Sequence, residues 1–294
     1  MVTRVPAGRV LACGLATVDV VQTVERMPGA NEKVVALGTR VEAGGPALNA
    51  AVTAALLGMP SRLATAVGWS PLAEVVRADC AAHGVELVDC AGEGFLVPVS
   101  SVLVTEPTGE RAVVSRNAVG VSSWASVDLA SVLDGVSAVL VDGHHLPVAV
   151  AVATRAREHG IPVVADAGSW KPGLETLLVH VDVLVASADF RVPKCAGQPD
   201  LVDLLALGPT WVARSDGADP VRWQSADGTS GSVTIPEVEV VDTLGAGDVL
   251  HGAFLADLAR QGTADLPGTL TRAVAVASCS VSATGARGWA GPRV

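Results

Sequence analysis

The stretch Val241-Asp242-Thr243-Leu244-Gly245-Ala246-Gly247-Asp248-Val249 decides the fold class of this chain. A β-like run from Val233 to Val241 precedes the glycines, and apolar residues at helical spacing follow them from Val249 to Leu258. A strand, a glycine turn and a helix start, in this order, form a pocket for an anion, because unpaired amide groups and the positive helix end face the same point. The two glycines let the backbone approach a phosphate closely.

Asp248 puts a carboxylate at the point of this stretch that favours negative charge. A base beside an anion site is what phosphoryl transfer to a hydroxyl requires. An acidic helix N-cap after a tight turn explains the same residue more simply. For this stretch alone the N-cap interpretation is favoured, so the rest of the chain has to decide.

Composition excludes several classes of protein. The net charge is −10 over 294 residues and no basic stripe is present, which argues against a nucleic-acid binder. No apolar run approaches the length of a membrane span, and no signal peptide is visible, so we expect a soluble, cytoplasmic protein with no membrane partner. The cysteines form no metal-ligand spacing and are expected to be reduced; they are Cys13, Cys80, Cys90, Cys195 and Cys279.

From Ala138 onward, buried strands alternate with helical patterns, which indicates a parallel sheet covered on both faces. Strands are predicted at 138–141, 162–165, 181–185 and 210–213, and helices at 148–159 and 174–179. Polar residues follow the predicted strand ends, where open α/β sheets bind ligands. They are Asp142 with His144 and His145, Asp166, Ser187 with Asp189, and Ser215 with Asp216.

The N-terminal half adds a first strand from Arg9 to Gly14, with Asp19 shortly after its end. Two polar, alternating stretches then interrupt the α/β pattern, with strands predicted at 20–24 and 33–37, and at 96–104 and 111–115. We expect these stretches to pair into one small sheet, inserted as a lid from about 19–43 and 95–116. The chain is otherwise interpreted as a single α/β domain over 1–294.

The segment Gly44-Gly45-Pro46-Ala47-Leu48-Asn49 runs into an alanine-rich helix predicted from Ala50 to Leu57. Paired glycines at a helix start bring the backbone close to a ligand, and Asn49 offers donors and acceptors to hydroxyl groups. A purely structural Gly-Gly turn explains the pattern about equally well.

Together, these motifs resemble those of the ribokinase-like (PfkB-type) sugar and nucleoside kinases, nearest to the ketohexokinase and sulfofructose kinase-like branch. The stretch 242–248 is similar to the family signature D-T-x-G-A-G-D, 44–49 to its Gly-Gly signature, and Gly14 to Asp19 to its first strand end. The resemblance covers nearly the whole chain. It implies a three-layer α/β/α sandwich with a mostly parallel central sheet and a small β-lid that often builds a homodimer.

The resemblance also implies roles for single residues. Asp248 is expected to be the general base, and the amides of Gly245, Ala246 and Gly247 to hold the transferring phosphoryl group. The expected sugar ligands are Asp19, Gly44, Gly45, Asn49, Asp142 and His144. The expected ATP-binding residues are Lys171, Ser215, Gly217, Thr243, Gly245 and Gly247, with the 285–291 tail beside the nucleotide.

The metal and substrate expectations include departures from the family pattern. Family members use MgATP, and many respond to a monovalent cation such as K⁺ near the residue that matches Asp242. The family's N-x-x-E motif is absent after Val185, where Asp189 is the nearest acidic residue. Pro46 stands where ribokinases carry a sugar-contacting Lys, which argues against ribose. His144 and His145 are candidates to read a sugar hydroxyl or an anionic substituent, or are structural residues.

Three functions compete. An ATP-dependent sugar kinase is favoured, and a nucleoside kinase of the same fold is the alternative within the family. A catalytically idle sugar- or nucleotide-binding homologue is the alternative from another class. A Rossmann dehydrogenase is excluded, because no G-x-G-x-x-G follows the first strand.

Overall fold

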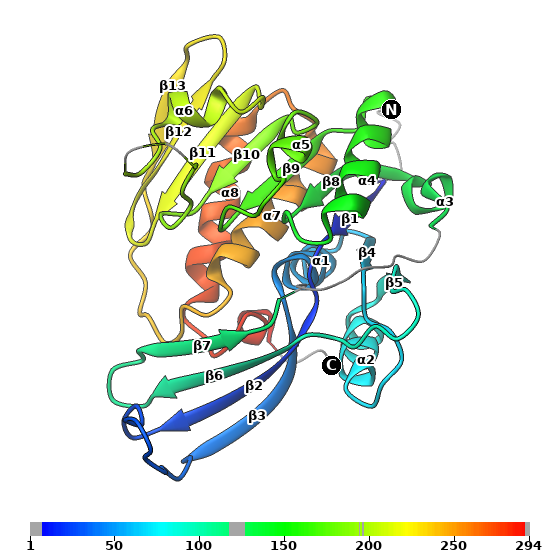
Figure 1. Ribbon diagram of the computed structural model, residues 1–294. Helices are drawn as coiled ribbons and strands as arrows, with labels where there is room; N and C mark the ends of the chain where they lie inside the picture. The colour runs from blue at the N-terminus through cyan, green and yellow to red at the C-terminus, as the bar shows by residue number, and fades with distance from the viewer. Residues whose placement is uncertain (1–7, 118–126, 194, 196, 292–294) are drawn as a thin grey trace.

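The computed structural model describes residues 8–117, 127–193, 195 and 197–291. Two sheets organise these residues: a nine-stranded sheet with helices on both faces, and a four-stranded sheet beside it (Figure 1). The predicted α/β/α sandwich with a small additional sheet is confirmed. Among the described residues, no helix combines the length and apolar character that a membrane span needs.

The large sheet has the strand order β13-β12-β11-β10-β9-β8-β1-β4-β5. The strands from β5 to β11 in this order run parallel, and β12 and β13 add an antiparallel edge that the sequence pattern did not predict. The strands are β1 (Arg9–Cys13), β4 (Ser61–Thr65), β5 (Val85–Asp89), β8 (Val136–Val141), β9 (Val163–Ala167), β10 (Val183–Ala186), β11 (Trp211–Asp216), β12 (Asp219–Ser225) and β13 (Ser230–Val233).

Helices cover both faces of this sheet. Alternate residues of β1 point to opposite faces, so that Val10 and Ala12 join one core and Leu11 and Cys13 join the other. The first core is closed by α1 (Pro46–Leu56), α2 (Ala73–His83), α7 (Ala246–Gln261) and α8 (Leu266–Ser280). The second core is closed by α3 (Leu129–Leu133), α4 (Leu146–Glu158), α5 (Glu175–Leu178) and α6 (Leu201–Leu205). A short 3₁₀ turn, η1 (Gly288–Ala290), follows α8.

The small sheet has the order β3-β2-β6-β7, with β2 and β6 parallel and both outer pairs antiparallel. Its strands are β2 (Thr17–Val24), β3 (Gly38–Gly44), β6 (Val99–Thr105) and β7 (Arg111–Ser115). Asp19 therefore lies within a strand of this sheet and not in a turn after β1. The small sheet projects below α1 and α7 in Figure 1, so that its inner end faces the start of both helices.

Two predicted strands were wrong. Residues 33–37 are irregular, and strand pairing with β2 begins at Gly38; the turn between the two segments carries an ion pair between Arg26 and Glu32. The run from Val233 to Val241 is a strand only up to Val233. Pro236 cannot donate to a ladder, and the amide of Val241 bonds instead to the carbonyl of Val281 at 2.8 Å.

Helix α1 begins earlier than predicted, at Pro46 rather than Ala50. Proline suits this first position, because its missing amide proton has no partner there in any case. Gly45 precedes it with φ 101°, and a Cβ at that position would lie 2.5 Å from the carbonyl oxygen of Leu15. Asn49 is thus in the first turn of the helix and is held at the sheet edge.

Candidate active site

The loop from Asp242 to Gly245 leads into α7, and the C-terminal segment holds it in place. One carboxylate oxygen of Asp242 accepts the amide of Leu244 at 2.8 Å and the other accepts the amide of Gly285 at 2.9 Å. Gly245 has φ 78°, and a Cβ there would lie 2.5 Å from the Cβ of Ala286. The loop therefore requires glycine and packs directly on residues near the chain's end.

The start of α7 keeps the geometry of an anion site. The amide of Ala246 bonds to the carbonyl of Thr243 at 3.3 Å, which forms the turn into the helix. Gly247 is exposed, and a Cβ built on it would meet nothing within 4 Å, so there is open space beside this backbone. Amides of a first helical turn and the helix dipole both favour an anion in such a space.

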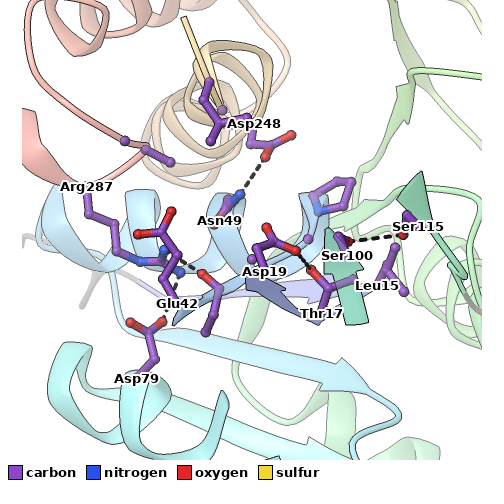
Figure 2. Close-up of a pocket in the computed structure, with 18 of the residues that line it drawn as sticks. Leu15, Thr17, Asp19, Glu42, Asn49, Asp79, Ser100, Ser115, Asp248 and Arg287 are labelled. Atoms are coloured by element: carbon purple, nitrogen blue, oxygen red, sulfur yellow. Dashed lines mark hydrogen bonds and ion pairs between the residues drawn. The ribbon is translucent and has the colours of Figure 1, made fainter. Parts of the chain in front are cut away.

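A pocket of about 340 Å³ lies between the small sheet, the first turns of α1 and α7, and the C-terminal segment (Figure 2). Six of the predicted site residues line it, although they come from three separate parts of the chain: Asp19, Gly44, Gly45, Asn49, Gly245 and Asp248. The polar residues that join them include Thr17, Glu42, Asp79, Ser100, Ser115, Asn117, Thr284 and Arg287.

Asp248 and Asn49 face each other across this pocket. The amide nitrogen Nδ2 of Asn49 donates to Oδ2 of Asp248 at 2.6 Å, while the buried Oδ1 of Asn49 has no partner among the described residues. The pKa of Asp248 is raised to about 7, first because burial disfavours the charged form and second because the carboxylate of Asp166 lies nearby. The Asn49 hydrogen bond and His251 oppose this rise. A carboxyl group with a pKa near neutrality is suited to accept a proton at pH 7.

Asp166 and His251 lie close enough to Asp248 to affect its pKa. In the sequence, Asp166 was noticed only because it follows a predicted strand, and His251 was not noticed. Nδ1 of His251 is 2.7 Å from the carbonyl of Gly247 and 3.5 Å from Oδ2 of Asp166. Nε2 of His251 is 3.2 Å from the carbonyl of Val185. Burial is the main reason why the pKa of Asp166 is raised, and Asp142 adds to the effect. This pair ties the start of α7 to the ends of β9 and β10.

On the opposite wall of the pocket, Asp19 is oriented by its neighbours. The hydroxyl of Thr17 donates to Oδ1 of Asp19 at 2.8 Å. A Cβ at Gly44 would lie 2.0 Å from Oδ2 of Asp19, so the carboxylate occupies the space that glycine leaves. Glu42 stands directly opposite Asp19 on the neighbouring strand β3.

Arg287 joins three segments around the pocket, and no sequence signal marked it. Its guanidinium donates to the carbonyl of Ala43 at 2.8 Å and to Oδ2 of Asp79 at 2.9 Å. It thereby connects the C-terminal segment to the inner end of β3 and to α2 (Figure 2). The residue lies in the tail that was expected to flank the nucleotide, but its contacts are on the wall shared with Glu42 and Asp79.

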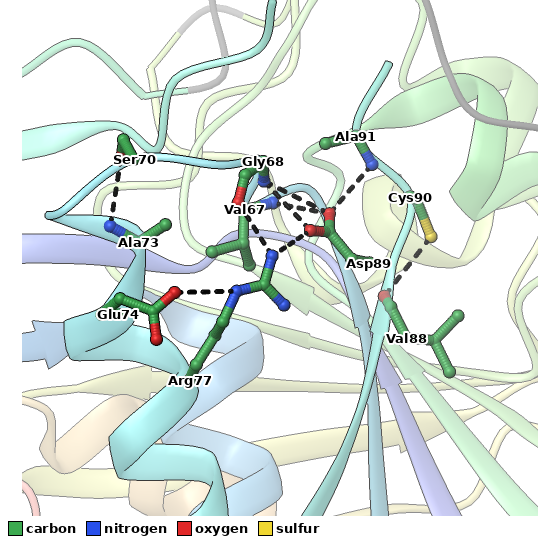
Figure 3. A network of polar contacts seen from close by, with 10 residues as sticks. All are labelled: Val67, Gly68, Ser70, Ala73, Glu74, Arg77, Val88, Asp89, Cys90 and Ala91. Carbon is green, nitrogen blue, oxygen red and sulfur yellow. Dashed lines mark hydrogen bonds and ion pairs between the residues drawn. The ribbon is translucent and has the colours of Figure 1, made fainter. Parts of the chain in front are cut away.

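Helix α2, which carries Asp79, is fixed in turn by a network at the ends of β4 and β5 (Figure 3). Asp89 accepts the amides of Val67 and Ala91, each at 3.0 Å. Arg77 of α2 donates to Asp89 at 2.7 Å and to the carbonyl of Gly68 at 2.8 Å. Burial would raise the pKa of Asp89, but these hydrogen bonds outweigh it and the pKa is lowered. The charged network holds α2 at the sheet edge.

Asp142, His144 and Lys171 do not line the pocket. The carboxylate of Asp142 accepts three backbone amides, from Leu15 at 2.8 Å, Ala47 at 3.2 Å and His144 at 2.9 Å. These bonds join the ends of β1 and β8 to the start of α1, so the geometry gives Asp142 a structural part. Lys171 donates to the carbonyl of Asp142 at 3.1 Å. Burial lowers the pKa of His144, which favours its neutral form.

The predicted nucleotide residues Ser215 and Gly217 lie at the β11–β12 hairpin, apart from the pocket. Ser215 donates to the carbonyl of Ala186 at 3.5 Å, and Gly217 is exposed with φ 56°. A second cavity of about 460 Å³ lies beside this hairpin, lined by Arg214, Asp216, Asp219, Pro220, Arg222 and Ser232.

The residues predicted to hold metals form no closed site. Within the described ranges, no three acidic, histidine or cysteine side chains are grouped as metal ligands. Asp189 is exposed, and its amide bonds to Oγ of Ser187 at 3.3 Å. Each carboxylate oxygen of Asp242 accepts one amide and keeps a lone pair for a cation. Asp189, by contrast, offers one exposed carboxylate, which suits an ion that brings most of its ligands with the nucleotide, as Mg²⁺ commonly does.

Comparisons with known proteins agree with this architecture. The sequence profile described as "pfkB family carbohydrate kinase" matches residues 7–290. The ribokinase of Bacillus subtilis is 26% identical over 289 residues, which cover 94% of this chain and 93% of that protein. A crystal structure of a proposed ribokinase from Agrobacterium tumefaciens has a TM-score of 0.83 at 26% identity, covering 96% of this chain and 94% of the other. The Arabidopsis thaliana ribokinase, solved with ribose and ATP, has a TM-score of 0.77 at 22% identity, covering 95% and 94%, and shows the shared fold.

Proposed function

This chain belongs to the pfkB family of carbohydrate kinases, and on that basis we propose that it transfers the γ-phosphoryl group of ATP to a hydroxyl of a small sugar bound in the pocket of Figure 2. The observation that carries the proposal is the position of Asp248. Its carboxylate faces the pocket from the first turn of α7, beside the glycine loop, and its pKa is raised to about 7. The proposed base, Asp248, and the proposed anion site at Gly245 thus lie on the same wall of the pocket.

In the proposed reaction, Asp248 takes the proton of the acceptor hydroxyl of the sugar. The oxygen of that hydroxyl bonds to the γ-phosphorus of ATP as the bond from the γ-phosphorus to ADP breaks, and ADP leaves. The amides of Gly245, Ala246 and Gly247 hold the phosphoryl oxygens as their charge develops, and the long 3.3 Å bond from Ala246 to the carbonyl of Thr243 gives way to the ligand. Asn49 keeps Asp248 in position through its 2.6 Å hydrogen bond and binds the sugar from the first turn of α1. Asp19, Gly44 and Gly45 bind the sugar from the small sheet. Mg²⁺, when bound with ATP, spreads the phosphate charge.

The remaining nucleotide contacts stay part of the proposal. We assign Thr243, Ser215 and Gly217 to the ATP side, Lys171 to the phosphates, and Asp242 to a monovalent cation such as K⁺. We propose that Asp189, the nearest acidic residue after Val185, takes the place of the missing N-x-x-E motif in ordering Mg²⁺. We propose that Asp142 and His144 support the sugar site from behind, because the bonds of Asp142 go to the backbone.

A sugar is favoured over a nucleoside by the walls of the pocket. The described residues that line it include aliphatic and polar side chains and no aromatic ring. A nucleobase is commonly bound by stacking on aromatic rings, which would have to come from outside this set. The sugar kinase is therefore the proposed function.

The small sheet also offers a surface to a second copy of the chain. Val41 and Val114 are exposed on its outer strands by 53% and 75%. We propose a homodimer through this sheet, since exposed apolar strands usually acquire a partner. Light scattering at micromolar concentration measures the mass directly, and a monomeric mass would contradict the dimer.

A two-stage assay tests the proposed function. Thermal unfolding is first followed with a panel of sugars and nucleosides in the presence of a non-hydrolysable ATP analogue, because a bound ligand raises the melting temperature. ADP release is then measured for each ligand that binds. We expect ATP-dependent turnover with at least one sugar. Binding without any ADP release would favour the idle homologue, and turnover with nucleosides alone would favour the nucleoside kinase.

A further inference from the structure

The pocket wall formed by the small sheet carries more negative charge than a neutral sugar requires. Asp19 and Glu42 stand directly opposite each other on the antiparallel strands β2 and β3, and both line the pocket. Directly opposite like charges destabilise a sheet. A positively charged group bound between the two carboxylates would offset their repulsion.

Glu42 has no strong partner within the described residues. Its one ion pair is with Arg40 on the same strand, at 3.7 Å, and both side chains are exposed by 36% or more. Such a surface pair contributes little. Figure 2 shows the carboxylate of Glu42 reaching into the pocket between Arg287 and Asn49. Arg287 does not neutralise it, because that guanidinium bonds to Asp79 and to the carbonyl of Ala43.

On the small-sheet wall, the hydrogen-bonding capacity left over is mainly that of acceptors. Ser100 donates to Ser115, and Ser115 donates to Asn117, so the hydroxyl protons on this wall are already used. The hydroxyl of Thr17 is likewise used on Asp19. By contrast, the carboxylates of Asp19 and Glu42 line the pocket, and the side chain of Glu42 is exposed by 36%. A ligand group that meets this wall is therefore one that donates.

We propose that the sugar phosphorylated here carries a positively charged amino group, and that Glu42 is the residue that selects it. An ammonium group has three N–H donors and a positive charge, so it satisfies Glu42 and relieves its repulsion with Asp19. Sugar acids and phosphorylated sugars are disfavoured by the same carboxylates. This inference rests on the proposed sugar-kinase function, and it disfavours a sugar with an anionic substituent.

The test compares matched sugars on wild-type protein and on Glu42→Gln. Each amino sugar is paired with its parent in which a hydroxyl replaces the amine, and with its N-acetyl and uronic acid relatives. Hydrogen bonds to charged groups support a preference of about tenfold or more in kcat/KM for the amino sugar over its parent. In Glu42→Gln this ratio should fall to within about threefold, through loss of the amino sugar's rate alone. Glu106→Gln, on the exposed turn after β6, is the matched control and should keep the wild-type ratio.

The outcomes separate this inference from the proposed function. A wild-type preference for the parent sugar, or an equal loss for both sugars in Glu42→Gln, overturns the role of Glu42. If no sugar is phosphorylated, the proposed function fails. Thermal shifts then decide the inference independently, since stabilisation by amino sugars that disappears in Glu42→Gln supports it and its absence overturns it.

Discussion

Replacing Asp248 with asparagine should abolish most of the activity and yet stabilise the protein. Burial and the nearby Asp166 raise the pKa of Asp248 from the ordinary 3.8 to about 7. The shift corresponds to at most about 4.5 kcal/mol, at roughly 1.4 kcal/mol per pKa unit. Because the side chain is half-buried and water enters the open pocket, we expect about 1–2 kcal/mol to be realised.

The sign of this effect depends on pH. Below pH 4 the carboxyl group is protonated in both the folded and the unfolded chain, so it makes no difference to stability. Between pH 4 and 7 the unfolded chain releases the proton while the folded protein retains it, so the free energy of unfolding falls as pH rises. The penalty is complete above the folded pKa of about 7. Asp248→Asn should therefore gain stability over wild type at pH 8 and lose that advantage towards pH 4.

Urea unfolding of wild type and Asp248→Asn at pH 5 and pH 8 measures this difference, with the exposed Asp134→Asn as control. In the same samples, kcat should fall by at least about 100-fold, the lower range for loss of a general base. For wild type, kcat/KM for the sugar should decline below pH 7, because the base becomes protonated. Asp166→Asn should move this decline to lower pH, since one cause of the raised pKa of Asp248 is removed. Near-normal turnover in Asp248→Asn, or an equal stability change at both pH values, would refute the reasoning.

Three further changes test the walls of the site. Gly44→Ala places a Cβ 2.0 Å from Oδ2 of Asp19 and should raise KM for the sugar about tenfold or more. Gly38→Ala is the control on the same strand, since its Cβ would meet nothing within 4 Å, and equal KM values for the two variants would contradict the assignment of this wall. Arg287→Met removes the hydrogen bonds to Ala43 and Asp79, so urea titration should show a free energy of unfolding lower by about 1–3 kcal/mol and kinetics a higher KM for the sugar. Unchanged values would mean that the site does not need these two bonds. In Asp142→Asn, the amide side chain accepts the three backbone amides less well than the carboxylate does, so the free energy of unfolding in urea should fall by about 2–4 kcal/mol. A variant as stable as wild type would exclude a structural role for Asp142.

The α/β layers were predictable because local pattern and global fold agree there. Runs such as Val139 to Val141 are apolar throughout, as strands buried on both faces must be. The pattern failed where partners decide the outcome. The run after Val233 has the alternation of a strand but finds no neighbouring strand among the described residues, and β3 begins only where Gly38 reaches Thr23 of β2.

The site divides in a similar way. Short sequence motifs reveal the glycines where the backbone must come close to a ligand, and the polar residues beside them. Gly44, Asn49 and Asp248, which belong to such motifs, do line one pocket. Arg287 could not be found from the sequence, because its role depends on the carbonyl of Ala43, 244 residues away along the chain. Asp142 was misleading for the opposite reason. It stands at a strand end like a ligand-binding residue, but its oxygens are used by the backbone.

The pocket draws its walls from residues as distant in sequence as Leu15 and Gly288. During synthesis on the ribosome the site therefore cannot close until Gly288 has emerged. A nascent chain that stops before Gly288 presents an incomplete pocket to its substrate, and a fragment that lacks the segment after α8 would keep most of the sheet while losing one wall of the pocket. Substrate binding is thus acquired in a single event, once this segment is in place, rather than piece by piece.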